Sequence, residues 1–168
     1  MAGARRPSPV PAARMVIGVG NANRGDDAVG LVVARLLRAR LGRTCAVVEQ
    51  TGEGTELLDL WEHQDRVWAV DAIRAGGAPG TLYRVPVGAE GLASPLATTS
   101  SHALSLGQAV ALGQALGRMP RVLVIHGVEP ARTDVGAGLS PLVRAAADAL
   151  VPRIESEVRE SMRGPPHA

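Results

Sequence analysis

The sequence predicts an α/β protein, a three-layer sandwich in which a mostly parallel, twisted sheet lies between helices on both faces. Short apolar runs alternate along the chain with segments of helical periodicity, as in a parallel sheet joined by crossover helices. Hydrophobic residues make up 46% of the chain and aromatic residues only 2%, so the core consists mainly of Ala, Val, Leu and Ile. Such residues suit buried strands, and right-handed crossovers place the covering helices on both faces.

Length and terminal composition predict one domain between two tails. A chain of 168 residues is long enough for one core and short for two. Residues 1–13 combine prolines with Ala, Gly and Arg, a composition that buries too little apolar surface to order itself. We therefore expect a flexible tail at 1–13, a single domain at 14–163 and a short C-terminal tail at 164–168.

Strands and helices alternate in the first half of the domain. Residues 15–19 form a short apolar run, typical of a strand that is buried on both faces. The next segment begins with two acids and repeats apolar residues at the i, i+3, i+4 and i+7 positions of an amphipathic helix. The same signals predict a strand at 46–48, a short helix at 54–61 and a strand at 67–70.

The second half contains one strand of a different kind. A glycine-rich turn at 76–80 leads into residues 81–85, whose alternating apolar pattern predicts a half-exposed, antiparallel edge strand. Serine and threonine residues then offer N-caps for a helix over 102–116. The last predicted elements are a buried strand at 122–125 and a helix that begins near Ser140, with a kink at Pro152.

Ligands of such sheets bind beyond the carboxyl ends of the strands, so residues that directly follow the apolar runs are candidates for chemistry. These are Asn21, Asp27, Asp71 and Gly127. Asp71 leaves a buried strand, where an acid usually has a charged partner or a metal ion. For Asp26 and Asp27 the helix dipole alone explains an acid in the first turn. Only one of two adjacent helical residues can face a cleft.

Two histidines are candidate ligands. His102 lies at a predicted helix start, where it caps the helix, faces solvent or binds a metal, and His126 at a strand end is a second candidate. One imidazole and two carboxylates suit a borderline divalent ion such as Ni²⁺ or Zn²⁺, although these residues form no compact metal-binding motif. The chain shows no evident covalent nucleophile, because Cys45 lies in an apolar run and no Gly-x-Ser-x-Gly motif occurs.

Two other classes of protein are disfavoured. The Gly18-Val19-Gly20 segment follows a strand, as in dinucleotide-binding proteins, but Asn23 stands where the third glycine is required. The two acids that follow would also repel a phosphate at that helix start. Nucleic-acid binding needs clustered cations and aromatic residues for stacking, and this composition supplies neither.

The sequence also predicts a cytoplasmic protein with no membrane partner. No apolar stretch reaches the roughly 18 residues that cross a bilayer, and the N-terminal segment lacks the apolar region of a signal peptide. The single cysteine, Cys45, cannot form an internal disulfide, which fits a reducing compartment.

Several segments together resemble the hydrogenase maturation protease family. The most specific is Ile-Gly-Val-Gly-Asn at 17–21, followed by Gly-Asp-Asp-Ala-Val-Gly at 25–30. Further matches occur in the family's order, namely Thr51-Gly52, Glu56-Leu57-Leu58, Asp71-Ala72, Pro79-Gly80-Thr81, His102 and Gly127-Val128-Glu129-Pro130.

The resemblance implies an endopeptidase that removes the C-terminal extension of a nickel-iron hydrogenase large-subunit precursor. It also implies that Asp27, Asp71 and His102 contact nickel already inserted in that precursor, so nickel belongs to the substrate and is not a stored cofactor. The first residue of this set is often Glu in close relatives, and Asp26 is an alternative to Asp27. A nickel-sensing scaffold that binds the precursor without cleaving it remains open, and a nucleotide-binding oxidoreductase is less favoured.

Overall fold

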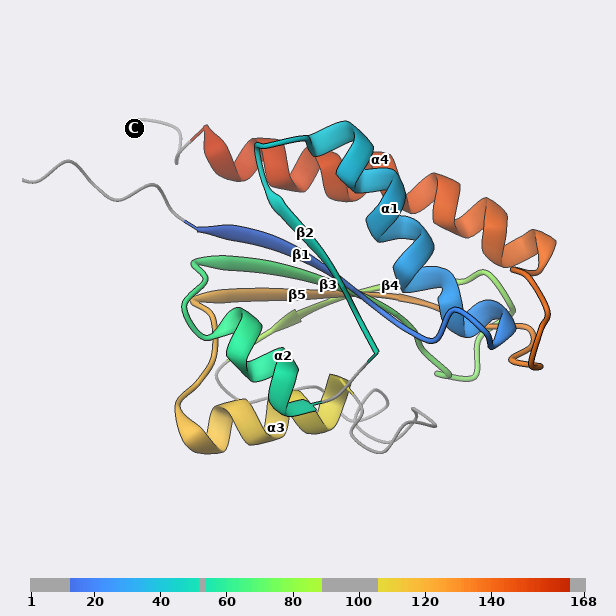
Figure 1. Cartoon of the computed structure of the whole chain (residues 1–168), viewed down its shortest axis with the longest axis horizontal. Helices are drawn as coiled ribbons and strands as arrows, with labels where there is room; N and C mark the ends of the chain where they lie inside the picture. The colour runs from blue at the N-terminus through green and yellow to red at the C-terminus, as the bar shows by residue number, and fades with distance from the viewer. Residues whose placement is uncertain (1–12, 52–53, 89–105, 164–168) are drawn as a thin grey trace, which may run out of the picture.

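The computed structural model describes residues 13–51, 54–88 and 106–163 (Figure 1). Strands and helices alternate through these ranges. In chain order they are β1 (Arg14–Val19), the 3₁₀ helix η1 (Gly25–Ala28), α1 (Val29–Leu41), β2 (Ala46–Gln50), α2 (Gly54–Trp61), β3 (Arg66–Ala72), β4 (Leu82–Val87), α3 (Leu106–Leu116), β5 (Val122–Val128) and α4 (Pro141–Met162).

These strands form one twisted sheet in the order β2-β1-β3-β5-β4. The pairs β1–β2, β1–β3 and β3–β5 are parallel, whereas β4 lies antiparallel to β5 at the edge. The predicted α/β class, the mostly parallel sheet and the antiparallel edge strand are therefore confirmed. The parallel strands all have their carboxyl ends at one edge of the sheet.

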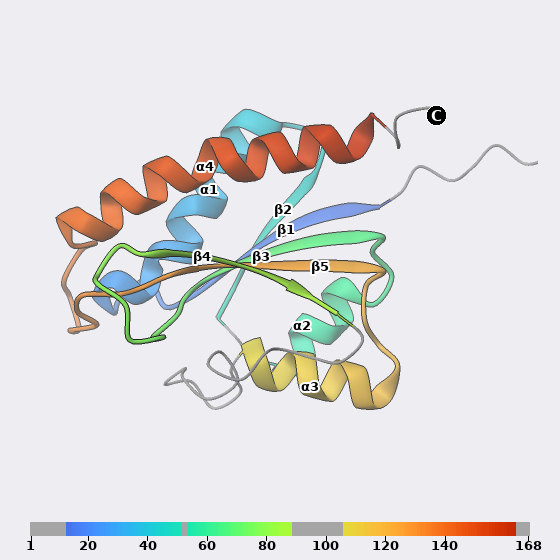
Figure 2. The ribbon, with the colours of Figure 1, turned by 180° about the vertical axis from the view of Figure 1, so that it is seen from behind.

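Helices cover both faces of the sheet. Figures 1 and 2 show α1 and α4 on one face and α2 and α3 on the other. Alternate residues of β3 belong to the two cores: Trp68 and Val70 pack with α1 and α4, whereas Val67 and Ala69 pack with α2 and α3. Because both faces of the central strands are buried, these strands are apolar at nearly every position.

The glycines that resemble a dinucleotide fingerprint instead allow close packing at the end of β1. A Cβ atom at Gly18 would lie 2.2 Å from the carbonyl oxygen of Gly30 in α1. A Cβ atom at Gly20 would lie 2.1 Å from the carbonyl oxygen of Asp27. Only glycine therefore lets η1 and α1 approach the sheet this closely.

One local feature differs from the sequence-based expectation. Asp26 and Asp27 lie in the 3₁₀ helix η1, before the first turn of α1, where the backbone N–H of Val29 bonds the carbonyl oxygen of Asp26. The last helix, α4, begins after Ser140 as predicted and continues through Pro152. Pro152 is exposed, so the carbonyl that its missing N–H leaves unpaired can be hydrated.

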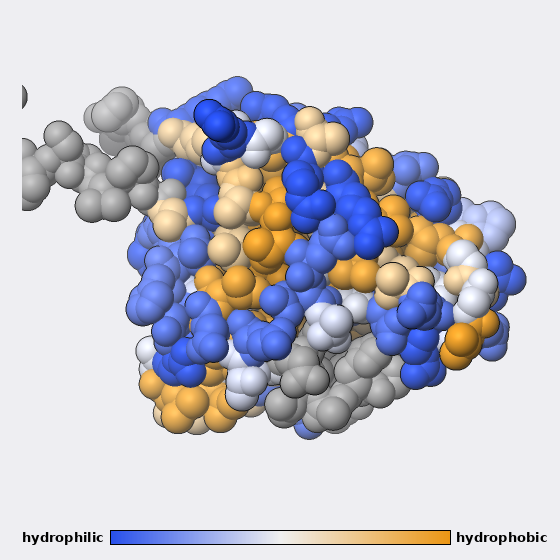
Figure 3. Space-filling model, viewed as in Figure 1, coloured by the Kyte–Doolittle hydropathy of each residue, from blue (hydrophilic) through white to orange (hydrophobic). Residues whose placement is uncertain are grey.

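In the view of Figure 3, hydrophilic residues over α1 and α4 alternate with hydrophobic ones, and a further group of hydrophobic residues lies over the end of α3. Leu116, the last residue of α3, is 56% exposed. Within the described ranges, no helix is both long and apolar enough to cross a membrane.

Candidate active site

Asp27 and Asp71 come together at the carboxyl edge of the parallel strands. Asp71 lies near the end of β3, and Asp27 lies in η1, which follows β1, the neighbouring strand. Only 4% of Asp71 and 6% of Asp27 is exposed to solvent. Two carboxylates are thus largely withdrawn from water at the sheet edge where ligands of this fold class bind.

The surroundings of Asp71 disfavour its ionised form. Burial raises the pKa of Asp71 well above its usual range, and the nearby charge of Asp27 raises it further. A hydrogen bond from the backbone N–H of Ala72 offsets only part of this effect. A cation between the two carboxylates would remove their repulsion, so the pair is suited to receive positive charge.

The backbone of Asp27 is held on both sides. Its N–H donates to the carbonyl oxygen of Arg24 at 3.0 Å, and its carbonyl oxygen accepts from the N–H of Asn21 at 3.2 Å. Gly20 contributes the space in which that carbonyl lies. The turn after β1 therefore fixes the position of the Asp27 backbone, from which the carboxylate side chain extends.

Asp26 has a different environment from its neighbour. Its carboxylate accepts hydrogen bonds from the backbone N–H groups of Ala131, Arg132 and Ser140 and from the Ser140 hydroxyl, at 2.6 to 3.0 Å. Burial by itself would raise the pKa of Asp26, but these bonds outweigh it and hold the pKa below its usual range. Because both oxygens are engaged, Asp26 joins η1 to the segment before α4 and is poorly placed to bind a metal ion.

His126 lies on the opposite face of the sheet from Asp71. It pairs with Val70 in the register of β3 and β5, whereas Asp71 pairs with Gly127. Its Nε2 atom lies 3.5 Å from Oε1 of Glu157 in α4. Because successive strand residues point to opposite faces, His126 cannot join Asp71 in one site.

His102, the third residue implied by the family resemblance, lies outside the described residues. In the ranges that the structure does describe, no three His, Cys, Asp or Glu side chains group closely enough to hold a metal ion. Strand β5 begins at the edge opposite the carboxyl edge, and α3 ends shortly before it. The first turn of α3 therefore lies toward the carboxyl edge of the sheet (Figure 1). Position 102 precedes that turn by a few residues.

Glu129 organises the loop after β3, and sequence reasoning assigned it only to a matching motif. Its carboxylate accepts hydrogen bonds from the Ala75 N–H at 2.8 Å, the Gly77 N–H at 3.3 Å and the Tyr83 hydroxyl at 2.8 Å. Burial opposes its ionisation, yet these donors keep the pKa of Glu129 below its usual range. Apart from that motif, the signal available in the sequence was its place soon after the apolar run of β5.

A cavity of about 540 Å³ opens beside the turn that follows β1. It extends along the end of β2 to the start of α2, and its lining includes Asn21, Asn23, Gln50, Thr51 and Glu56. These side chains supply amide, hydroxyl and carboxylate groups that can bind a peptide backbone. The carboxyl edge of the sheet thus combines a buried acidic pair with a nearby polar cavity.

Comparison with known proteins identifies the family to which this chain belongs. The family model for hydrogenase maturation proteases matches residues 31–157, and the chain therefore belongs to that family. Its members are proteases, so the protein is an enzyme that hydrolyses peptide bonds.

Individual relatives agree over nearly the whole chain. Hydrogenase 2 maturation protease of Escherichia coli is 28% identical over 155 residues, which cover 88% of this chain and 91% of the relative. Among solved structures, the hydrogenase maturating endopeptidase HybD from E. coli superimposes with a TM-score of 0.70 at 25% identity, covering 89% of this chain and 93% of that one. The [NiFe] hydrogenase maturation protease HycI from Thermococcus kodakarensis gives a TM-score of 0.67 at 25% identity, with coverage of 88% and 93%.

Proposed function

We propose that this protein removes the C-terminal extension of a nickel-iron hydrogenase large-subunit precursor. Family membership and similarity to hydrogenase maturation proteases across 88% of the chain support this activity. The observation that carries the proposal is the buried pair of Asp27 and Asp71 at the carboxyl edge of the sheet, where electrostatic repulsion favours binding of a cation.

The proposed site consists of Asp27, Asp71 and His102. The two carboxylates come from η1 and β3, and the family resemblance supplies His102, which lies outside the described residues. Two carboxylates and one imidazole form an incomplete coordination shell for a transition metal ion. The remaining ligands would come from the precursor, so nickel is recognised as part of the substrate.

This arrangement explains how the protein could test its substrate before cutting it. A precursor without nickel offers no cation to the acidic pair and leaves the carboxylates repelling each other. A loaded precursor satisfies them, and the ion can then position or polarise the carbonyl group of the scissile peptide. Binding of the correct substrate and readiness for cleavage are thereby coupled.

The partner of the protein is accordingly the large-subunit precursor, and the proposed location is the cytoplasm. The single cysteine, Cys45, is buried and free, which suits a reducing compartment.

A cleavage assay separates this function from that of a nickel-sensing scaffold. Purified nickel-loaded precursor is incubated with the wild-type protein, and the mass of the large subunit is followed by mass spectrometry. The proposal expects the loss of a C-terminal peptide with wild-type protein and none with Asp71→Asn. Stable complex formation without any change in mass would support the scaffold instead.

A further inference from the structure

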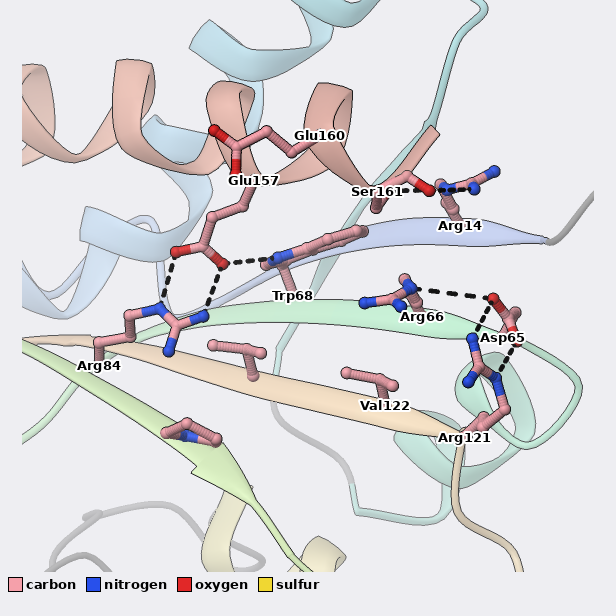
Figure 4. Close-up of a pocket in the computed structure, with 12 residues that line it drawn as sticks. Arg14, Asp65, Arg66, Trp68, Arg84, Arg121, Val122, Glu157, Glu160 and Ser161 are labelled. Carbon is pink, nitrogen blue, oxygen red and sulfur yellow. Dashed lines mark hydrogen bonds and ion pairs between the residues drawn. The ribbon is translucent and has the colours of Figure 1, made fainter. Parts of the chain in front are cut away.

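A second cavity lies at the opposite edge of the sheet from Asp27 and Asp71. It has a volume of about 770 Å³ and runs between the C-terminal half of α4 and strands β3, β4 and β5. We call it the arginine groove, because four of its lining residues are arginines (Figure 4). It opens where the parallel strands begin, so it is separate from the candidate active site.

The floor of the arginine groove is apolar. Val122 and Val124 of β5 and Pro86 of β4 contribute aliphatic surface. The Trp68 ring also borders the groove, but it is only 3% exposed and donates its indole N–H to Glu157 at 2.9 Å. The ring is therefore not available for stacking on a nucleobase, and the floor instead suits small apolar side chains.

Two of the arginines are neutralised by carboxylates. Arg84 bonds both oxygens of Glu157, at 2.8 and 3.2 Å, and Arg121 bonds both oxygens of Asp65. These pairs join β4 to α4 and the start of β5 to the start of β3. Because Glu157 and Asp65 neutralise them, Arg84 and Arg121 border the groove and are not available to bind a ligand.

Arg66 differs from these two. Its Nε atom forms only a long ion pair, at 4.0 Å, with Oδ2 of Asp65, an acid already bonded by Arg121, and its guanidinium makes no hydrogen bond to any residue that the structure describes. Its side chain is 34% exposed, and in Figure 4 it lies between Trp68 and the Asp65–Arg121 pair. A guanidinium has five N–H donors in a planar fork that matches a carboxylate, so Arg66 is arranged to receive one.

The charge balance limits what can bind. The lining contains four arginines and three carboxylates, so most of its positive charge is balanced by acids of the same groove. A nucleic-acid backbone requires several uncompensated cations, whereas the one guanidinium of Arg66 fits a single carboxylate. An apolar floor several residues long next to one carboxylate-binding group fits an extended peptide.

We propose that the arginine groove docks an extended segment of the protein substrate, with an acidic side chain of that segment bound by Arg66. The identity of the partner rests on the proposed function, whereas binding of an acidic peptide does not. Docking far from the cleavage site would add affinity that is equal in the ground and transition states, so it would lower KM without changing kcat.

Binding is tested by ¹H–¹⁵N NMR titration with a blocked hexapeptide that contains one glutamate among alanines and valines, and with its glutamine counterpart. We expect the glutamate peptide to shift the Trp68 indole signal and the amides of Arg66 and Val122. Arg66→Gln should weaken this binding about tenfold, the effect of one charge-assisted pair. Arg43→Gln, an exposed position in the turn after α1, is the matched control and should leave binding unchanged.

Processing of the nickel-loaded precursor supplies the second readout. Arg66→Gln should raise KM about tenfold and leave kcat unchanged, whereas Arg43→Gln should alter neither. Equal binding of the two peptides, or a wild-type KM for Arg66→Gln, would overturn the proposal. If no variant cleaved the precursor, the proposed function would fail, and the peptide titration would still decide whether the groove binds an acidic segment.

Discussion

Exchange for asparagine should cost more stability at Asp26 than at the adjacent Asp27. The buried Asp26 carboxylate accepts four hydrogen bonds, three of them from the backbone N–H groups of Ala131, Arg132 and Ser140. An asparagine at position 26 keeps one acceptor oxygen. Its NH₂ group replaces the other oxygen and faces a donor from which it cannot accept a hydrogen bond. The loss of a charged acceptor at a buried site costs about 2 to 4 kcal/mol.

A cost of this size lowers the melting temperature of a domain of this length by roughly 4 to 16 °C. Asp27→Asn removes the charge that helps to raise the pKa of Asp71, so it relieves repulsion and should lower the melting temperature less than Asp26→Asn does. Differential scanning calorimetry at pH 7 measures both. An unchanged melting temperature for Asp26→Asn, or an equal loss for Asp27→Asn, would refute this division of roles.

In cleavage activity, Asp27→Asn should be the more impaired of the two variants. Asp26→Asn, assayed well below its melting temperature, should retain part of the cleavage activity, because the Asp26 side chain acts only on the position of η1. Asp27→Asn should retain almost none, because it removes a proposed nickel contact. Cleavage assays on both folded variants decide this, and a fully active Asp27→Asn would move the contact elsewhere.

Three further predictions concern other parts of the molecule. His102→Ala should abolish precursor processing with an unchanged circular dichroism spectrum, and near-normal cleavage would remove His102 from the site. Gly30→Ala places a Cβ atom 2.2 Å from the Val19 carbonyl and 2.3 Å from that of Val70, so urea titration should show a loss of about 3 kcal/mol or more. Burial opposes ionisation of Glu157, but hydrogen bonds lower its pKa from 4.5 to about 2, so its stabilisation is present above pH 4.5 and disappears as the pH falls toward 2. Glu157→Gln should therefore be less stable than wild type by about 2 kcal/mol at pH 7, with the difference vanishing in acid-denaturation curves near pH 2.

The general place of the site could be predicted because it follows from topology. Asp27 and Asp71 both come after apolar runs, and neighbouring parallel strands present their carboxyl ends at one edge. The structure brings the two acids close enough for the charge of Asp27 to raise the pKa of Asp71. Their role toward nickel remains a proposal.

The role of Asp26 could not be predicted from the sequence. Its hydrogen-bond donors lie 105 to 114 positions further along the chain, and no local pattern announces them. Sequence reasoning placed both acids in one α-helical turn and could choose between them only by helical geometry. The contacts across the fold distinguish them instead.

The position of His126 shows a second limit of sequence patterns. Residues 122–125 are apolar at every position because β5 is buried on both faces, so their periodicity does not reveal which face His126 occupies. Only the pairing of His126 with Val70, and its approach to Glu157, place it away from Asp71.

The most direct test of the central claim is whether cleavage requires nickel in the substrate. Purified protein is incubated with nickel-free and with nickel-loaded precursor, each with and without a chelator too weak to strip the loaded precursor, and the released C-terminal peptide is quantified by mass spectrometry. Because the proposed ligands Asp27, Asp71 and His102 would form an incomplete shell, the protein should hold free metal weakly and cleave only the loaded precursor, whether or not the chelator is present. Efficient cleavage of the nickel-free precursor, or activity that follows metal bound beforehand to the protein, would contradict this account.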